Sequence, residues 1–441
     1  MPRSLQPIAV TVLLAAACAG RARPSTTPLP TVAASPADAA YDGQLAVRRW
    51  GREGAPPLVL IHGLGDAAGN DFATVGPLLA RDHRVHAIDL PGFGASRGAG
   101  HSFHPGDYAE LVAEYIAHHT EGRASVVGHS MGGAVAALLA GRHPERVDRL
   151  VLVDVAGVLH REAWAGSMAI EPVRAHNGTI AGMMESTLGV SRSFEPDLEE
   201  VVAHPRLRRG LLGDDPGRVS GISLITTDLG EALDGIAAPT LLVWGAEDRV
   251  APLRTSRVLE GRIVGSRRVV MEGVGHVPMS DDPGRFVSHV RGHLNAEAAV
   301  TRDVESRKRE IRCEDEEGLT LTGRLGRVEL YGCRRVHIAD ATIDSLVVHD
   351  SDVVLEAVSI ASPGTAVEAE NAELRITGGS ITGDVAFELS HARLDMAGVR
   401  VDGSRAAFLI GEPSRALFSV CPVRSGDQTI HAHGAVVLAA E

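Results

Sequence analysis

The sequence predicts an α/β domain with a mostly parallel sheet, followed by an all-β domain. From residue 44 onward, short apolar runs rich in β-branched residues alternate with helical stretches. After Asn295 this alternation ends, and short alternating runs with almost no helical signal follow. The length of 441 residues is also too great for one ordinary core, so at least two domains are expected.

Seven apolar runs are candidate strands of the first domain, at residues 45–50, 58–61, 85–88, 125–127, 150–153, 240–243 and 268–271. Helical stretches such as 134–142 lie between several of them. Strands that alternate with helices and are apolar on both faces indicate a parallel sheet covered on each side. We expect this domain to span residues 41–298.

Residues 157–233 interrupt the alternation and predict a cap. The segment is helical and loop-like, and it contains Met168, Met183 and Met184. An insertion here would lie over the carboxyl edge of the sheet, where open α/β folds bind ligands. A flexible cap with methionines suits an apolar substrate pocket. A purely structural insertion is the alternative.

The C-terminal part follows a predicted charged linker at 299–317 and is expected at 318–441. Its candidate strands lie at residues 336–343, 353–360, 374–381, 394–401 and 416–423. Gly, Asp, Ser or Asn residues occupy the intervals, as expected for turns.

Four residues of this part align as an internal repeat. Ile338, Leu355, Ile376 and Met396 follow one another at intervals of about 20 residues, and internal repetition is the sequence signature of solenoids. The region therefore resembles a right-handed parallel β-helix. A small β-sandwich is the alternative.

The N-terminal residues 1–18 predict an export signal. Arg3 supplies a positive charge, and residues 8–17 form an apolar run that is too short to span a membrane. Residues 19–40 contain mainly Pro, Ala, Ser and Thr without apolar periodicity, which indicates a disordered linker. The protein is therefore expected in the periplasm or cell envelope.

Residues 14–18, Leu-Ala-Ala-Ala-Cys, resemble the bacterial lipobox, although the leucine stands one position early. This resemblance implies that Cys18 is lipidated after cleavage and attaches the protein to a membrane. The alternative is a plain secretory signal cut near Ala17 or Ala19.

Charge and cysteine content narrow the function further. The formal net charge is −13 and no sustained basic stripe occurs, which excludes nucleic acid as an expected partner. Without Cys18, three cysteines remain: Cys313, Cys333 and Cys421. They allow at most one disulfide, and the sequence leaves the pairing open.

Residues 128–132, Gly-His-Ser-Met-Gly, match the motif G-x-S-x-G between a predicted strand and a predicted helix. A serine on such a turn is exposed at the sheet edge, and Ser130 is therefore the candidate nucleophile. The N-terminal amides of the following helix point toward developing negative charge.

A serine hydroxyl needs a base, and the base needs an acid that orients it. His276 follows the last predicted strand and has the chain order that this motif requires, which sets it apart from the other histidines. Asp248 follows the strand at 240–243 and is the candidate acid; Glu247 and Asp154 are its rivals.

Residues 62–65, His-Gly-Leu-Gly, follow an earlier strand. In folds with this nucleophile turn, a backbone N–H of this loop pairs with that of the residue after the serine. Leu64 and Met131 are therefore the candidate oxyanion donors.

Over residues 41–294 the chain resembles the capped members of the α/β-hydrolase superfamily, also in the turn Asp-Leu-Pro-Gly-Phe-Gly-Ala-Ser at 89–96. The resemblance implies acyl transfer to water through an acyl-serine, with a small or medium apolar ester as substrate. Thioesters and carbon–carbon bonds beside a ketone are alternatives of the same fold.

No metal and no organic cofactor are expected, because the metal-binding and phosphate-binding motifs are missing from the sequence. A second hypothesis makes the β-helix-like domain the functional part, with a glycan or cell-surface partner.

Overall fold

The computed structural model describes residues 31–33, 44–65, 68–96, 103–160, 163–164, 204–213, 215–295 and 309–439. Two compact units are present; one ends at Glu297, and the main part of the other follows it. No helix in these ranges combines the length and the apolar character that crossing a bilayer requires.

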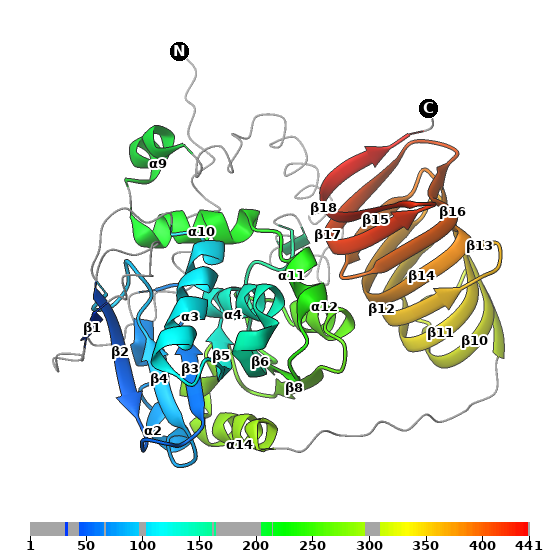
Figure 1. The fold of residues 1–441 in the computed structure, drawn as a ribbon. Coiled ribbons are helices and arrows are strands. Elements are labelled where there is room, and N and C mark those ends of the chain that lie inside the picture. Colours follow the sequence, from blue (N-terminus) through cyan, green and yellow to red (C-terminus); the bar gives the residue numbers. More distant parts are fainter. Residues whose placement is uncertain are drawn as a thin grey trace. The chain divides into compact units, whose positions relative to one another are not determined.

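The first unit is built on an eight-stranded sheet with the order β1-β2-β4-β3-β5-β6-β7-β8 (Figure 1). Its strands are β1 (Thr31–Ala33), β2 (Gln44–Trp50), β3 (Pro57–Ile61), β4 (Arg84–Ile88), β5 (Ala124–His129), β6 (Val147–Val153), β7 (Thr240–Gly245) and β8 (Arg267–Met271). From β4 to β8 all neighbours are parallel, and β1 and β2 are antiparallel additions. The α/β prediction is confirmed.

Helices cover both faces of this sheet. Helix α4 (Met131–Arg142) packs on β5 and β6 together with α3 (Pro105–His119) and α11 (Gly230–Gly235). On the other face, α14 (Pro283–Leu294) packs with α2 (Gly76–Leu79) against a fully buried cluster of strand residues. All six residues of β5 are buried, as both-sided cover requires. Helix α13 (Pro278–Asp281) completes this unit, and α12 (Arg254–Arg262) begins in it but belongs to the other unit from Arg257 onward.

The predicted cap is described only in part. Residues 165–203, with the three methionines, lie outside the described residues. Two helices of the cap are seen, α9 (Pro205–Leu212) and α10 (Pro216–Thr226). The buried Leu212, Val219 and Ile222 form a small separate cluster of their own. The cap is thus held partly by its own packing.

The main part of the second unit, from Arg309 onward, is all-β. Its strands are β9 (Arg309–Glu314), β10 (Thr320–Tyr331), β11 (Val336–His349), β12 (Asp352–Ala361), β13 (Thr365–Glu370), β14 (Glu373–Ser390), β15 (Arg393–Ala397), β16 (Arg400–Ile410), β17 (Ser414–Ser425) and β18 (Gln428–Leu438). All pair in parallel except β18, which lies antiparallel to β17.

The strand register follows the sequence repeat. Ile338 pairs with Leu355, Leu355 with Ile376, and Ile376 with Met396, as the alignment predicts. All four side chains are buried in one core. Parallel pairing between residues one repeat apart is the arrangement of a solenoid. The specific assignment to a right-handed parallel β-helix stays a prediction.

Two predicted linkers are shorter than expected. Residues 31–33 form β1 against the edge of β2, although the sequence predicts a linker at 19–40. Main-chain hydrogen bonds make this pairing and need no apolar periodicity. The second unit begins at Arg309, inside the predicted linker at 299–317. Strand β9 is highly charged, which is why its sequence does not resemble a buried strand.

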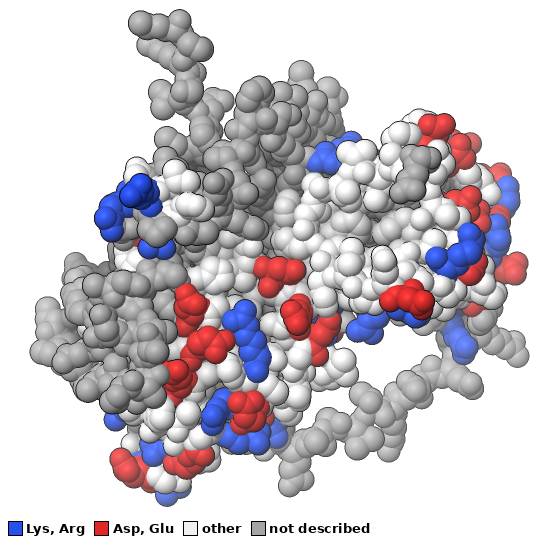
Figure 2. Space-filling model, turned by 45° about the horizontal axis from the view of Figure 1, so that its top comes forward, with Lys and Arg blue, Asp and Glu red and all other residues white. Residues whose placement is uncertain are grey.

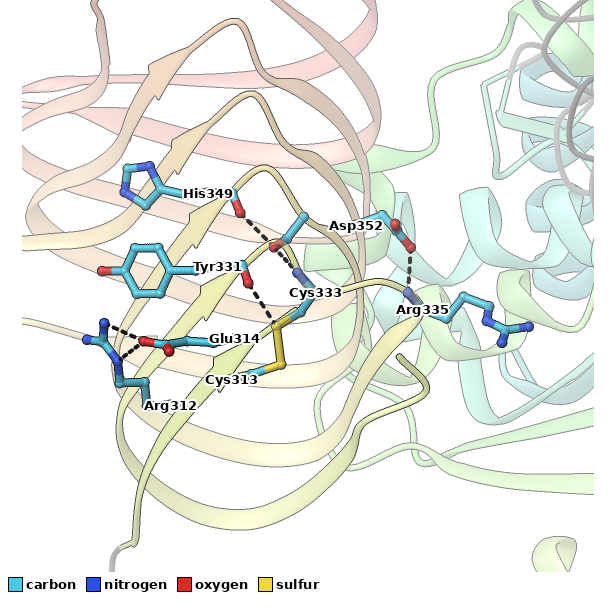
Figure 3. Close-up of a disulfide and its surroundings, with 9 residues drawn as sticks. Arg312, Cys313, Glu314, Tyr331, Cys333, Arg335, His349 and Asp352 are labelled. Carbon is cyan, nitrogen blue, oxygen red and sulfur yellow. Dashed lines mark hydrogen bonds and ion pairs between the residues drawn. A yellow bond between two sulfur atoms is a disulfide. The ribbon is translucent and has the colours of Figure 1, made fainter. Parts of the chain in front are cut away.

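One disulfide joins the first two rungs of the second unit, between Cys313 of β9 and Cys333 (Figure 3). Ser351 accepts a hydrogen bond from the Cys333 N–H at 2.8 Å and donates one to the His349 carbonyl at 2.7 Å. The third cysteine, Cys421, is free and buried. The structure therefore settles the pairing that the sequence left open.

Ion pairs connect successive rungs on the outside of this unit. Arg424 pairs with Asp402 at 2.6 Å, and the two residues lie opposite each other in the register. Arg312 pairs in the same way with Glu329 at 2.7 Å. Such cross-strand pairs favour one register over a slipped one. In Figure 2, acidic and basic side chains lie interspersed on the drawn face.

We expect removal of the disulfide to weaken the second unit selectively. The two cysteines are 20 residues apart, so the Cys313→Ala/Cys333→Ala variant should lose about 3 kcal/mol of unfolding free energy. Urea unfolding would be followed by circular dichroism and by tryptophan fluorescence. All three tryptophans precede residue 245 and lie in the first unit. The urea midpoint of the fluorescence transition should be unchanged, while the midpoint of a dichroism transition should fall. A reductant should lower the urea midpoint of the dichroism transition in the native protein but not in the variant. Equal dichroism transitions in the native protein and the variant without reductant would contradict this expectation.

Candidate active site

Ser130 stands on a sharp turn between β5 and α4. Its φ of 52° lies in the left-handed region, which is costly for a residue with a side chain. The neighbouring Gly132 is required by close packing, because an added Cβ would overlap the carbonyl oxygens of Ile61 and His62. The turn thus lies directly against the end of β3, where the predicted oxyanion loop begins.

The structure brings Ser130, His276 and Asp248 together in one hydrogen-bonded chain. The Ser130 Oγ lies 3.0 Å from His276 Nε2, and His276 Nδ1 lies 2.9 Å from Asp248 Oδ2. Both distances are within proton-transfer reach. Ser130 is 3% exposed, so this contact is almost fully removed from water.

Main-chain donors hold the Asp248 carboxylate in place. Its Oδ1 accepts from the Val250 N–H at 2.7 Å and from the Ala251 N–H at 3.0 Å. The other oxygen is left for His276. An acceptor fixed at Nδ1 keeps the His276 proton on that nitrogen and leaves Nε2 free to accept the serine proton.

The two rival acids do not contact His276. Glu247 is exposed to solvent. Asp154 is fully buried and its Oδ1 accepts from the Gly245 N–H at 2.9 Å. Burial and the nearby Asp248 carboxylate raise the pKa of Asp154 well above its ordinary value. The environment of Asp154 thus favours its protonated form, and Asp248 is the acid that contacts His276.

Burial also determines the basicity of His276. Removal from water lowers the pKa of His276 below 6.5, against the opposing influence of the Asp248 hydrogen bond. A base with a lowered pKa is neutral at pH 7 and is ready to accept a proton.

The predicted oxyanion donors are main-chain groups of Leu64 and Met131. Neither the Leu64 N–H nor the Met131 N–H donates a hydrogen bond to any residue within the described ranges. Met131 begins α4, whose N-terminus favours negative charge. His62 anchors the Leu64 loop, because its Nε2 accepts from the Leu90 N–H at 2.9 Å.

Helix α10 of the cap lies close to this loop. A Cβ added at Gly221 would come within 3.5 Å of the Leu64 side chain. The Leu64 side chain thus lies against the cap helix α10.

The sequence assigned no role to two further residues at this site, Asp71 and His129. His129 Nε2 lies 2.8 Å from the His276 carbonyl oxygen, and His129 Nδ1 lies 3.6 Å from Asp71 Oδ2. His129 belongs to the nucleophile motif, so the sequence predicts its position next to Ser130. The motif does not predict that His129 contacts Asp71. Nothing in the sequence around Asp71 marks it, since the contact depends on the tertiary fold.

The predicted lipidation site cannot be placed in the structure. Cys18 lies outside the described residues. Within the part of the chain that the structure describes, no group of three or more His, Cys, Asp or Glu side chains could hold a metal ion.

The chain is similar to known hydrolases over its first unit. A model of the alpha/beta hydrolase fold matches residues 56–283, which include all three residues of the hydrogen-bonded chain. A pimeloyl-[acyl-carrier protein] methyl ester esterase of Aeromonas hydrophila is 31% identical over 252 residues, which cover 55% of this chain and 96% of the relative.

A second esterase of the same name, from Nitrosomonas europaea, is 32% identical over 243 residues, covering 53% of this chain and 93% of the relative. The solved structure of a hydrolase from Pseudomonas aeruginosa is 27% identical with a TM-score of 0.45, covering 62% of this chain and all of that one.

We expect Asp248→Asn to lower kcat by about 10⁴-fold with little effect on folding, because the amide favours the wrong histidine tautomer. Ester hydrolysis and thermal unfolding would be measured side by side. Glu247→Gln is the matched control, since Glu247 is the exposed neighbouring acid. Similar kcat values for both variants would show that Asp248 is not the acid of this site.

Proposed function

The chain belongs to the alpha/beta hydrolase fold family, and from that premise we propose that it is an exported serine esterase. It cleaves an apolar carboxylic ester through an acyl-serine intermediate. The observation that carries this proposal is the continuous hydrogen-bonded chain from Ser130 through His276 to Asp248.

In the first half-reaction, Ser130 Oγ attacks the ester carbonyl carbon while His276 Nε2 takes its proton. The Leu64 and Met131 amides donate to the carbonyl oxygen as it becomes negative. The tetrahedral intermediate then collapses. His276 returns the proton to the departing alcohol, and the acyl group remains on Ser130.

In the second half-reaction, a water molecule takes the place of the alcohol. His276 accepts its proton, and the resulting hydroxide attacks the acyl-serine carbonyl. Collapse breaks the acyl–Oγ bond, His276 returns its proton to Ser130 Oγ, and the carboxylic acid is released. Asp248 stays ionised throughout and stabilises the imidazolium that forms in each half.

The choice of an ester rests on the relatives and on the site. The two esterases cited above are named for a methyl ester of an acyl group carried by a protein. The apolar Leu64 and the nearby helix α10 favour an apolar acyl group here. The rest of the cap determines the acyl length.

The disulfide supports export. Disulfides form and persist mainly in oxidising compartments and are rare in the cytosol. The Cys313–Cys333 bond fits an envelope location, as do the charged and apolar residues of the N-terminal signal. We further propose that lipidated Cys18 attaches the protein to a membrane.

We expect native protein, but not Ser130→Ala, to be labelled by a fluorophosphonate and to hydrolyse p-nitrophenyl esters of graded acyl length. Loss of the Oγ should reduce turnover by about 10⁶-fold. Ser404→Ala, which removes an exposed serine of the second unit, is the control and should behave as native. Undiminished hydrolysis by Ser130→Ala would overturn the mechanism. Cleavage of a ring-fission diketone in preference to every ester would overturn the substrate class.

The attachment to a membrane has its own test. When the full-length gene is expressed in a bacterium, native protein should incorporate labelled palmitate and sediment with membranes. Cys18→Ser should lose both properties while retaining esterase activity, because Cys18 is far in sequence from the catalytic motifs. Cys421→Ser is the control for a cysteine that is not at the signal. Native protein that carries no palmitate label and is found in the soluble periplasm would agree with export but refute lipidation.

A further inference from the structure

A second pair of a histidine and an aspartate lies beside the catalytic one. The His129 side chain is 5% exposed and the Asp71 side chain 18% exposed. The rings of His129 and His276 have centroids 5.0 Å apart. The proposed reaction uses neither residue of this pair.

His129 connects the nucleophile strand to the loop of the catalytic histidine. Its Nε2 lies 2.8 Å from the main-chain carbonyl oxygen of His276. A carbonyl oxygen only accepts, so Nε2 carries a hydrogen and donates it. Because His129 directly precedes Ser130, this bond ties the loop of the base to the residue next to the nucleophile.

The other ring nitrogen faces Asp71. His129 Nδ1 lies 3.6 Å from Asp71 Oδ2, an ion-pair distance. A carboxylate also only accepts, so the ring presents a donor to both partners only when both nitrogens carry hydrogen. In that form His129 is an imidazolium that neutralises the Asp71 carboxylate.

Asp71 also reaches the oxyanion loop. Its Oδ2 accepts from the Gly63 N–H at 3.4 Å, one residue before Leu64. Gly63 fits closely against the pair, since an added Cβ would lie 2.9 Å from His129 Nδ1 and 3.0 Å from Ser130 Cβ. The loop position thus depends on Asp71 and His129 together.

The pKa of Asp71 is consistent with this contact. Burial, the largest influence, would raise the pKa of Asp71, but the interactions with His129 and the Gly63 N–H bring it below its ordinary value. Asp71 is therefore a carboxylate at neutral pH.

We propose that Asp71 and His129 form a positioning pair that fixes the oxyanion loop and the His276 loop relative to Ser130. This inference rests on the proposed esterase function. The pair touches no reacting atom. It connects the three segments whose relative placement determines the reaction geometry, where an error of 1 Å costs about 100-fold in rate.

The charges of the pair give a specific test. Three groups act on His276: the Asp248 carboxylate and the Asp71 carboxylate raise its pKa, and His129 lowers it. Asp71→Asn should therefore shift the acid limb of the kcat/KM profile to lower pH. His129→Gln, whose amide still donates toward the His276 carbonyl, should shift it to higher pH. A purely structural role would not produce shifts of opposite sign.

We expect each single variant to lower kcat by about 10- to 100-fold with KM nearly unchanged, since the pair acts on the transition-state geometry. The loss in the Asp71→Asn/His129→Gln double variant should be smaller than the product of the single losses. In His129→Gln an unpaired carboxylate faces the oxyanion loop, and removing its charge should restore part of kcat. Fluorophosphonate titration would give the concentration of folded sites in each preparation.

Glu110→Gln is the matched control. Glu110 forms a pair with His143 at 2.7 Å that is partly exposed and takes no part in the site. It should leave kcat and the acid limb unchanged. Unchanged kinetics in both pair variants, or acid limbs that move in the same direction, would overturn the positioning pair. Failure of native protein to react with the fluorophosphonate would instead overturn the esterase function itself.

Discussion

The left-handed backbone of Ser130 is the constraint on which the rest of the site depends. It turns the chain from a buried strand into a helix within one residue, so that the hydroxyl leaves the sheet while the next N–H faces the same space. Such a conformation costs about 1–3 kcal/mol and persists only when its surroundings impose it. Here β5 is buried along its whole length, and Gly132 lets α4 approach the carbonyl oxygens at the end of β3. The hydrophobic packing of the sheet thus stabilises a turn that local propensity disfavours.

The chemistry at this turn requires one negative charge in the correct place. Two carboxyl groups, Asp248 and Asp154, lie near each other at the ends of neighbouring strands. Two main-chain N–H groups and an imidazole stabilise the charge on Asp248. Asp154 accepts one N–H bond in a fully buried place, where burial and the Asp248 carboxylate raise its pKa well above the ordinary value. Different environments therefore act differently on the same residue type, and Asp248 is the acid that orients His276.

The sequence predicted the parts of this protein that local pattern determines. The nucleophile turn is local, because strand, glycines and helix follow one another directly. The rung register was also predictable, because Ile338, Leu355, Ile376 and Met396 repeat an apolar position that must face one core. Strand β9 was not predicted, because four of its six residues are charged and its buried residue is a cysteine, so no apolar alternation marks it. The contact between Asp71 and His129 was missed for a different reason: it joins residues that only the folded sheet brings together.

Two histidine–aspartate pairs near Ser130 have a consequence for the oxyanion. A lone Asp71 carboxylate next to the Leu64 loop would oppose the negative charge that forms on the carbonyl oxygen, and the low dielectric of a buried site would strengthen that effect. The His129 ring beside Asp71 lowers the pKa of that carboxyl, and when both ring nitrogens carry hydrogen it balances the Asp71 charge, so that Asp71 can anchor the Gly63 N–H without adding net charge. In the catalytic pair the charge changes, because His276 begins neutral and becomes positive as the oxyanion becomes negative. The Asp71–His129 pair thus holds the loops in place while the charge of the catalytic pair changes during the reaction.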